Sequence, residues 1–195
     1  MNWLAHVFLS EPNVEFQLGN LLADVVRGPQ RDAMSAAFVR GALCHKAIDA
    51  FTDAHPIVKR SRARMSSEHR RFSGVLIDVF YDYFLARDWK RYSASALETY
   101  TAAFYAGAEP HLTQLPPDAR TMLERIIRYD LLGSYARVDG VEAALRRISS
   151  YLNSRWHKQF NLDRGVLDLR AHEAEFAADF HEFFPLLQAH ARLQA

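Results

Sequence analysis

The feature that most restricts the fold of this sequence is its helical periodicity, which runs almost without interruption along the chain. Apolar residues recur three and four positions apart, as on one face of an α-helix, and alternating strand-like runs are missing. The best strand candidate, residues 165–169, is too short to build a sheet. The sequence therefore predicts an all-α fold. The expected helices cover roughly residues 2–9, 16–26, 32–52, 57–65, 72–86, 96–113, 119–132, 141–153 and 169–191.

Turn-forming residues fall between these helices, at Gly28-Pro29, His55-Pro56, Pro116-Pro117 and Asp139-Gly140. Ser95 and Asp118 are expected to cap helices, because their side-chain oxygens can accept an unpaired backbone N–H. No repeat, low-complexity tract or long linker divides the 195 residues. We therefore expect a single helical bundle spanning residues 1–195.

Composition narrows the class of protein. Hydrophobic residues make up 49% and charged residues 24%, which is typical of a globular protein. The net charge of +1 gives no general indication of nucleic-acid binding. A lone cysteine, Cys44, excludes an internal disulfide and a Cys-rich zinc site, and fits a reducing compartment. The amino terminus lacks the basic region of a signal peptide, and no apolar stretch approaches the ~20 residues of a membrane span. We expect a cytoplasmic protein.

Several His and Asp residues lie on apolar helical arcs, where they are unexpected. Asp78 and Asp82 are four apart, so both leave the same side of a helix between apolar neighbours such as Val79. Two carboxylates side by side are costly to bury unless a positive group lies between them. A divalent cation or an arginine would serve, and a solvated helix edge is the alternative.

Three earlier segments repeat this pattern. His45 and Asp49 are four apart on the preceding helix, a spacing that also produces ordinary surface N–H···O contacts. Asp24 follows an apolar run and can pair with Arg27, while His6 has the default interpretation of a satisfied core histidine. Imidazole and carboxylate groups are common ligands of first-row divalent ions. Four segments with this pattern in the first 82 residues predict a shared metal site.

Other catalytic signatures are missing: the sequence has no Gly-x-Ser-x-Gly elbow, no P-loop, no Gly-x-Gly-x-x-Gly and no His-Glu-x-x-His. One basic run is prominent. It is interpreted either as a solvated helix face or as a docking surface for an acidic protein or phosphate groups. Its members are Lys59, Arg60, Arg62, Arg64, Arg70 and Arg71.

These same segments resemble the acyl carrier protein phosphodiesterases, also called acyl carrier protein hydrolases. The resemblance covers roughly the first 90 residues and follows the family's motif order. The matching stretches are Met1-Asn2-Trp3-Leu4-Ala5-His6; Gly19-Asn20-Leu21-Leu22-Ala23-Asp24 with Val26-Arg27-Gly28; His45-Lys46-Ala47-Ile48-Asp49 with Thr52-Asp53 and His55-Pro56; and Arg70-Arg71 with Gly74, Asp78, Asp82, Phe84-Leu85 and Trp89.

The family is similar to the HD-type metal-dependent phosphohydrolases, so the resemblance implies an HD-domain-like helical bundle. Three features depart from the expected pattern, one of which is Lys46, at a position where Arg is expected. No adjacent His-Asp pair occurs, and His45 and Asp49 stand where its equivalent would be. Tyr83 occupies a position where relatives often have His, so Tyr83 would have to replace that His by a hydrogen bond, or the role has moved.

The resemblance implies hydrolysis of the phosphodiester that joins 4′-phosphopantetheine to the serine of holo-acyl carrier protein. Manganese is the first expectation for the cofactor, followed by magnesium. Asp24, His45, Asp49 and Asp78 are the expected catalytic residues, and the same four with His6 and Asp82 form the expected metal-binding set.

The resemblance also implies which residues meet the substrate. Arg27 is expected at the phosphate. Because acyl carrier proteins are acidic, the basic run from Lys59 to Arg71 is expected to dock the carrier protein.

Two alternatives remain open. The first is an HD-like phosphohydrolase that acts on a nucleotide or another small phosphodiester and needs no protein-docking surface. The second is a non-catalytic helical module that binds carrier protein. The oligomeric state is open in each case.

Overall fold

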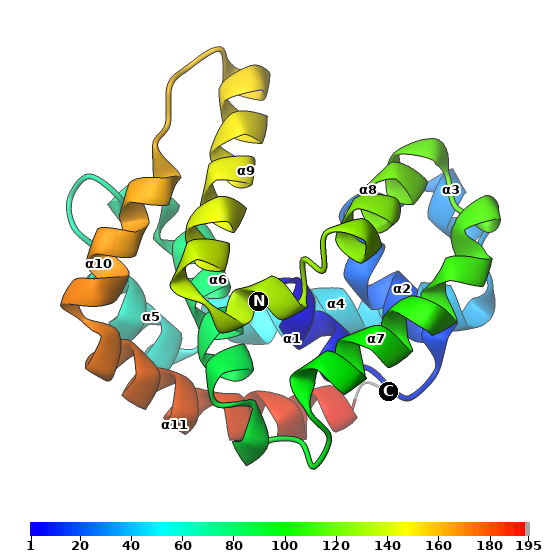
Figure 1. The fold of residues 1–195 in the computed structure, drawn as a ribbon, viewed down its shortest axis with the longest axis horizontal. Helices are drawn as coiled ribbons and strands as arrows, with labels where there is room; N and C mark the ends of the chain where they lie inside the picture. Colours follow the sequence, from blue (N-terminus) through cyan, green and yellow to red (C-terminus); the bar gives the residue numbers. More distant parts are fainter. Residues whose placement is uncertain (194–195) are drawn as a thin grey trace.

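The computed structural model describes residues 1–193, and within that range every regular element is helical (Figure 1). Short 3₁₀ segments connect several of the helices. The α-helices are α1 (Trp3–Phe8), α2 (Val14–Leu22), α3 (Pro29–Asp32), α4 (Ala36–Ala54), α5 (Pro56–Ala63), α6 (Ser73–Arg87), α7 (Leu97–Ala108), α8 (Pro117–Arg128), α9 (Val138–Trp156), α10 (Val166–Ala171) and α11 (Glu173–Arg192). The 3₁₀ segments are η1 (Arg70–Phe72), η2 (Trp89–Arg91), η3 (Glu109–Gln114), η4 (Gly133–Ala136) and η5 (Leu162–Gly165). The expected all-α class is confirmed.

The boundaries differ from the prediction where the chain makes short turns. The predicted helix at 32–52 begins only at Ala36, as α4, while Asp32 ends the separate short helix α3; the Ser35 hydroxyl accepts from Phe38 N at the start of α4. The predicted helix at 96–113 is α-helical only as far as Ala108, the end of α7. It continues as the 3₁₀ segment η3, which contains Pro110 near its start. The strand candidate, residues 165–169, is instead helical: residue 165 ends η5 and residues 166–169 lie in α10, where Val166 and Leu169 are three apart and both are buried in the core.

Both predicted N-caps are wrong. Helix α7 begins after Ala96, and the hydroxyl of Ser95 lies 3.0 Å from that of Ser93. Helix α8 begins at Pro117, which places Asp118 inside the first turn. There its negative charge still favours the helix N-terminus through the helix dipole.

Helix α6 is the centre of the bundle. It is buried almost all round from Leu76 to Ala86 and packs against α1, α5, α9 and α11. One continuous hydrophobic core joins α6 to Phe180 and its aromatic neighbours on α11. Among residues 1–193, no helix is both long and apolar enough to cross a membrane.

Helices α2 and α4 approach each other so closely that their backbones touch. A Cβ on Gly19 would lie 2.0 Å from the carbonyl oxygen of Phe38, and a Cβ on Gly41 would lie 2.0 Å from that of Phe16. Only glycine fits at these two crossing points. The crossing brings the end of α2, at Asn20, against His45 one turn along α4.

Candidate metal centre

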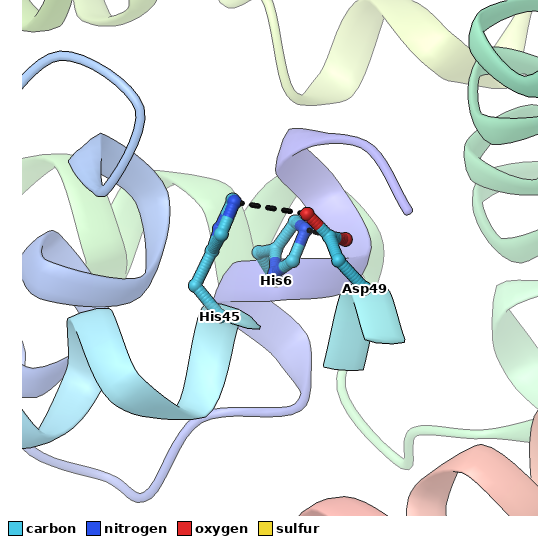
Figure 2. Close-up of side chains that lie close together, drawn as sticks. All are labelled: His6, His45 and Asp49. Carbon is cyan, nitrogen blue, oxygen red and sulfur yellow. Dashed lines mark ion pairs between the residues drawn. The ribbon is translucent and has the colours of Figure 1, made fainter. Parts of the chain in front are cut away.

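Three side chains from two helices meet close to the centre of the fold. His6 of α1, His45 of α4 and Asp49 of α4 each offer a ligand atom, and these atoms all lie within 4.8 Å of one another. The Nε2 atom of His6 is 3.2 Å from Asp49 Oδ1, and the Nε2 atom of His45 is 3.1 Å from Asp49 Oδ2. Figure 2 shows both rings directing these nitrogens at the carboxylate. The rings stack, with centroids 4.0 Å apart.

Asn20 contacts the Nδ1 atoms of both rings. Its side-chain Oδ1 lies 2.8 Å from Nδ1 of His6, and its backbone carbonyl oxygen lies 2.7 Å from Nδ1 of His45. Its Nδ2 donates to the backbone oxygen of His6 and to the hydroxyl of Ser10, which orients the amide. Both oxygens facing the rings can only accept, so both histidines donate from Nδ1. In the neutral ring, Nε2 then carries the lone pair.

This arrangement requires a positive charge at the cluster. Two Nε2 lone pairs and two oxygens of Asp49 face one another, and the backbone oxygen of Met1 is 3.2 Å from His6 Nε2. Lone pairs that face lone pairs repel unless a proton or a cation lies between them. Imidazole nitrogen and carboxylate oxygen suit manganese, magnesium or zinc to differing degrees. The residues present therefore fit a divalent cation.

The pKa values of the three side chains agree with the need for a positive charge at the cluster. Burial lowers the pKa of His6 to about 4, so this ring is neutral at pH 7. Burial also lowers the pKa of His45, but the hydrogen bond and charge of Asp49 outweigh it and raise the pKa above the usual 6.5. Burial alone would raise the pKa of Asp49, yet the two histidines and the Met1 amino group hold it far below its usual range. Without metal, a proton on His45 supplies the charge.

The second acidic pair, on α6, faces the amino-terminal segment. Asp78 Oδ1 lies 3.2 Å from the amino group of Met1, which is also 3.0 Å from Asp49 Oδ1. Asp82 is completely buried and accepts from Leu4 N and Ala5 N at the start of α1. The positive groups beside these carboxylates are thus an ammonium and helix N–H groups. Burial raises the pKa of Asp78, and it raises that of Asp82 to about 7.

A cleft of about 500 Å³ opens beside His45. Asp24 lines it, with its side chain 77% exposed, Oδ2 3.7 Å from His45 Nε2 and Oδ1 3.2 Å from Arg27. Arg31 and Lys46 also line the cleft, so its wall carries three cationic side chains next to the cluster. The cleft can therefore attract an anion to the cluster.

The structure divides the basic run into paired and unpaired members. Arg60 and Arg64 both pair with the buried carboxylate of Asp179 on α11, and Arg62 pairs with Asp53. Their charge is largely compensated within the fold. Lys59, Arg70 and Arg71 are exposed and have no carboxylate partner within residues 1–193.

Sequence patterns alone do not show what two residues contact. Asn20 lies in one of the matching motifs, but its contacts with the two rings depend on the α2–α4 crossing and not on any spacing. The hydroxyl of Tyr83 donates to Glu173 Oε1 at 3.0 Å, so its hydrogen bond leads to α11 and away from the cluster.

The fold and site together define an all-α protein with a candidate divalent-metal centre beside a cationic cleft. A sequence profile described as acyl carrier protein phosphodiesterase matches residues 1–187. The chain therefore belongs to the acyl carrier protein phosphodiesterase family. Among solved structures, none matches this chain.

Several curated relatives carry the same family name. The acyl carrier protein phosphodiesterase of Serratia proteamaculans is 32% identical over 193 residues, which cover 98% of each chain. That of Pectobacterium atrosepticum is 31% identical over 195 residues, covering 100% of this chain and 99% of the relative. That of Yersinia pestis is 43% identical over 89 residues, 46% of each chain.

Proposed function

We propose that this protein is a metal-dependent phosphodiesterase that releases 4′-phosphopantetheine from holo-acyl carrier protein. The reaction adds one water across the bond between phosphorus and the serine oxygen. Its products are a phosphate monoester and apo-acyl carrier protein with a free serine hydroxyl. The observation that carries the proposal is the His6–His45–Asp49 cluster at the wall of a cationic cleft, in a chain whose relatives bear that enzyme name.

The ligands proposed for the cation are Nε2 of His6, Nε2 of His45 and the carboxylate of Asp49, because these atoms already converge. Asp24, which lies 3.7 Å from His45 Nε2, and Asp78, which shares the Met1 amino group with Asp49, are proposed as further ligands. We propose manganese as the first candidate for this ion and magnesium as the second. When bound, the cation supplies Lewis-acid polarisation at phosphorus and lowers the pKa of a water molecule.

The other residues hold the reacting groups in place. Asp82 receives two N–H groups of α1 and so positions His6 rather than meeting the metal itself. Asp24 is exposed to the cleft, where its carboxylate can orient a water molecule. Arg27 and Arg31 face the same cleft and are proposed to bind the non-bridging phosphate oxygens.

The docking surface proposed for the carrier protein is the unpaired part of the basic run. Lys59, Arg70 and Arg71 are free to meet an acidic partner, whereas Arg60 and Arg64 are held by Asp179. Reversing the charge of Arg60 or Arg64 would place two acids together and damage the fold. A docking test therefore uses the unpaired cations.

The experiment is intact-mass analysis of holo-acyl carrier protein after incubation with this protein and manganese, magnesium or EDTA. We expect loss of the phosphopantetheine mass only when metal is present. The variant His45→Gln should abolish conversion, while the matched control His172→Gln, in a half-exposed ring between α10 and α11, should retain it. No conversion by folded, metal-loaded protein would overturn the proposed substrate.

Two further arms separate the alternatives. Hydrolysis of bis(4-nitrophenyl) phosphate without action on the carrier protein would favour the small-phosphodiester enzyme. Binding of carrier protein without turnover of either substrate would favour the non-catalytic module. If the proposal is correct, joint replacement of Lys59, Arg70 and Arg71 by Glu raises KM for the carrier protein about tenfold or more, with kcat on the small substrate unchanged.

A further inference from the structure

A second cavity, of about 360 Å³, lies between the end of α8, η4 and the first half of α9. None of the residues that line this cavity also lines the cleft beside His45. Three arginines, Arg125, Arg137 and Arg147, line the cavity together with Ser134 and a single acid, Asp139. Nothing in the proposed reaction uses this cavity.

Arg147 is the unusual member of the set. Its Nη2 atom is buried and has no hydrogen-bond partner within residues 1–193. A buried donor of a charged group that lacks a partner destabilises the fold. The neighbouring Arg146, on the exposed side of the same helix, pairs with Glu142 in the ordinary way. The unpaired group is therefore a particular feature of the cavity.

The charges in the cavity are not balanced. Asp139 is engaged by Arg137, whose Nε lies 3.3 Å from Asp139 Oδ1. Neither Arg125 nor Arg147 has a carboxylate within ion-pair distance in the part of the chain that is described, and burial together with the charge of Arg125 lowers the pKa of Arg147. Three arginines against one aspartate leave a net charge of +2.

The cavity wall is held in place by its own hydrogen bonds. Asp130, which has a positive φ of 43°, accepts from the Tyr105 hydroxyl at 2.9 Å and from Gly133 N at 3.2 Å. The Tyr105 hydroxyl in turn accepts from Leu132 N at 3.1 Å. A loop fixed in this way loses little conformational entropy when it receives a ligand.

We propose that this cavity is a binding site for a phosphate monoester, distinct from the metal cluster and its cleft. A phosphate monoester carries about −1.5 to −2 charges at pH 7, which matches the net charge of the lining. Its three free oxygens suit the forked donors of arginine, and Arg147 lines the cavity with a guanidinium that is not fully paired. A small-ligand site of ~300 Å³ or more is large enough for the phosphate and part of its ester group. The proposal does not depend on the reaction proposed above.

The test measures thermal unfolding against the concentration of inorganic phosphate or phenyl phosphate at constant ionic strength, with EDTA present to exclude bound metal. A ligand that binds only the folded state raises the midpoint by mass action. We expect both phosphates to stabilise the wild type, and acetate and chloride to have no comparable effect. Arg147→Met should weaken the affinity for phosphate at least tenfold, and Arg146→Met is the matched control that retains it.

A second signature distinguishes ligand binding from a structural role of Arg147. In phosphate-free buffer, Arg147→Met should unfold at the same midpoint as the wild type or higher, because the change removes an unpaired buried charge. If that variant fails to fold, Arg147→Lys provides the affinity measurement, since it keeps the charge and loses the fork. A phosphate effect that survives in Arg147→Met and disappears in Arg31→Met would assign the anion to the cleft beside His45 and overturn the proposal. Absence of any phosphate effect on the wild type would overturn it too.

Discussion

Replacing Asn20 with alanine tests how the two imidazole rings are prepared for metal. The side chain of Asn20 is fully buried and makes three short contacts, with His6 Nδ1, His6 O and Ser10 Oγ. Alanine leaves Nδ1 of His6 without its partner, whereas the backbone oxygen of His6 still accepts from the Ser10 hydroxyl at 2.8 Å. We expect a loss of about 1–3 kcal/mol in the free energy of unfolding.

The larger consequence concerns the tautomer of His6. Once Oδ1 of Asn20 is gone, the ring proton can move to Nε2 and form a hydrogen bond to Asp49, 3.2 Å away. That tautomer has no lone pair at Nε2 for a metal. Loss of an outer partner of a ligating histidine typically weakens metal affinity about 10–100-fold, or roughly 1.4–2.7 kcal/mol.

The assay is calorimetric titration with manganese alongside thermal unfolding. The control is Asn153→Ala, since Asn153 makes paired hydrogen bonds to the backbone of Phe160 and lies outside the cluster. The control should lose stability and keep the affinity of the wild type for manganese. Folded Asn20→Ala protein that binds manganese within about twofold of the wild type would refute the reasoning.

Four other results are expected. Asp24→Ala should remove metal-dependent hydrolysis but change the free energy of unfolding by less than about 0.5 kcal/mol, because the side chain is exposed; full retained activity would exclude Asp24 from the mechanism. Manganese affinity should fall about tenfold per pH unit below the raised pKa of His45 and level off above it, because a proton on His45 competes with the metal. His6, with its pKa near 4, stays unprotonated in this range and adds no such competition. A flat calorimetric profile between pH values of about 6 and 8 would contradict this prediction. In metal-free protein, the raised pKa of His45 adds stability below 6.5 that is lost as pH rises through that pKa, which denaturant titration can measure. Asp179→Ala should destabilise by about 2–3 kcal/mol in a urea titration, less than for a fully buried pair because Arg60 is 47% exposed; an unchanged midpoint would show that the pair contributes nothing.

The helices and one part of the cluster followed from local sequence. Periodicity located the helices, since burial of one face is what makes an isolated helical segment stable. The four-residue spacing of His45 and Asp49 predicted that both would leave the same side of α4, and they form an ion pair at 3.1 Å.

Contacts between distant segments could not be predicted from the same patterns. The spacing of Asp78 and Asp82 indicated a shared direction, but not that Asp82 would accept N–H groups of α1, 77 and 78 positions away in sequence. The basic run looked like free charge because Asp179, which pairs with Arg60 and Arg64, is more than 110 positions further along the chain. Boundaries such as the break between α3 and α4 depend on local caps that periodicity does not resolve.

The close crossing of α2 and α4 makes the two histidines unequal targets for variation. His6 is oriented by a side-chain amide, which any substitution at Asn20 alters. His45 is oriented by a main-chain carbonyl, which every residue type at position 20 would still present. Only a change that separates the helices, such as a side chain at Gly19 or Gly41, can release it. Substitutions at position 20 can therefore change the orientation of His6 step by step. The orientation of His45 depends on the backbone and is lost only when the helix crossing itself is lost.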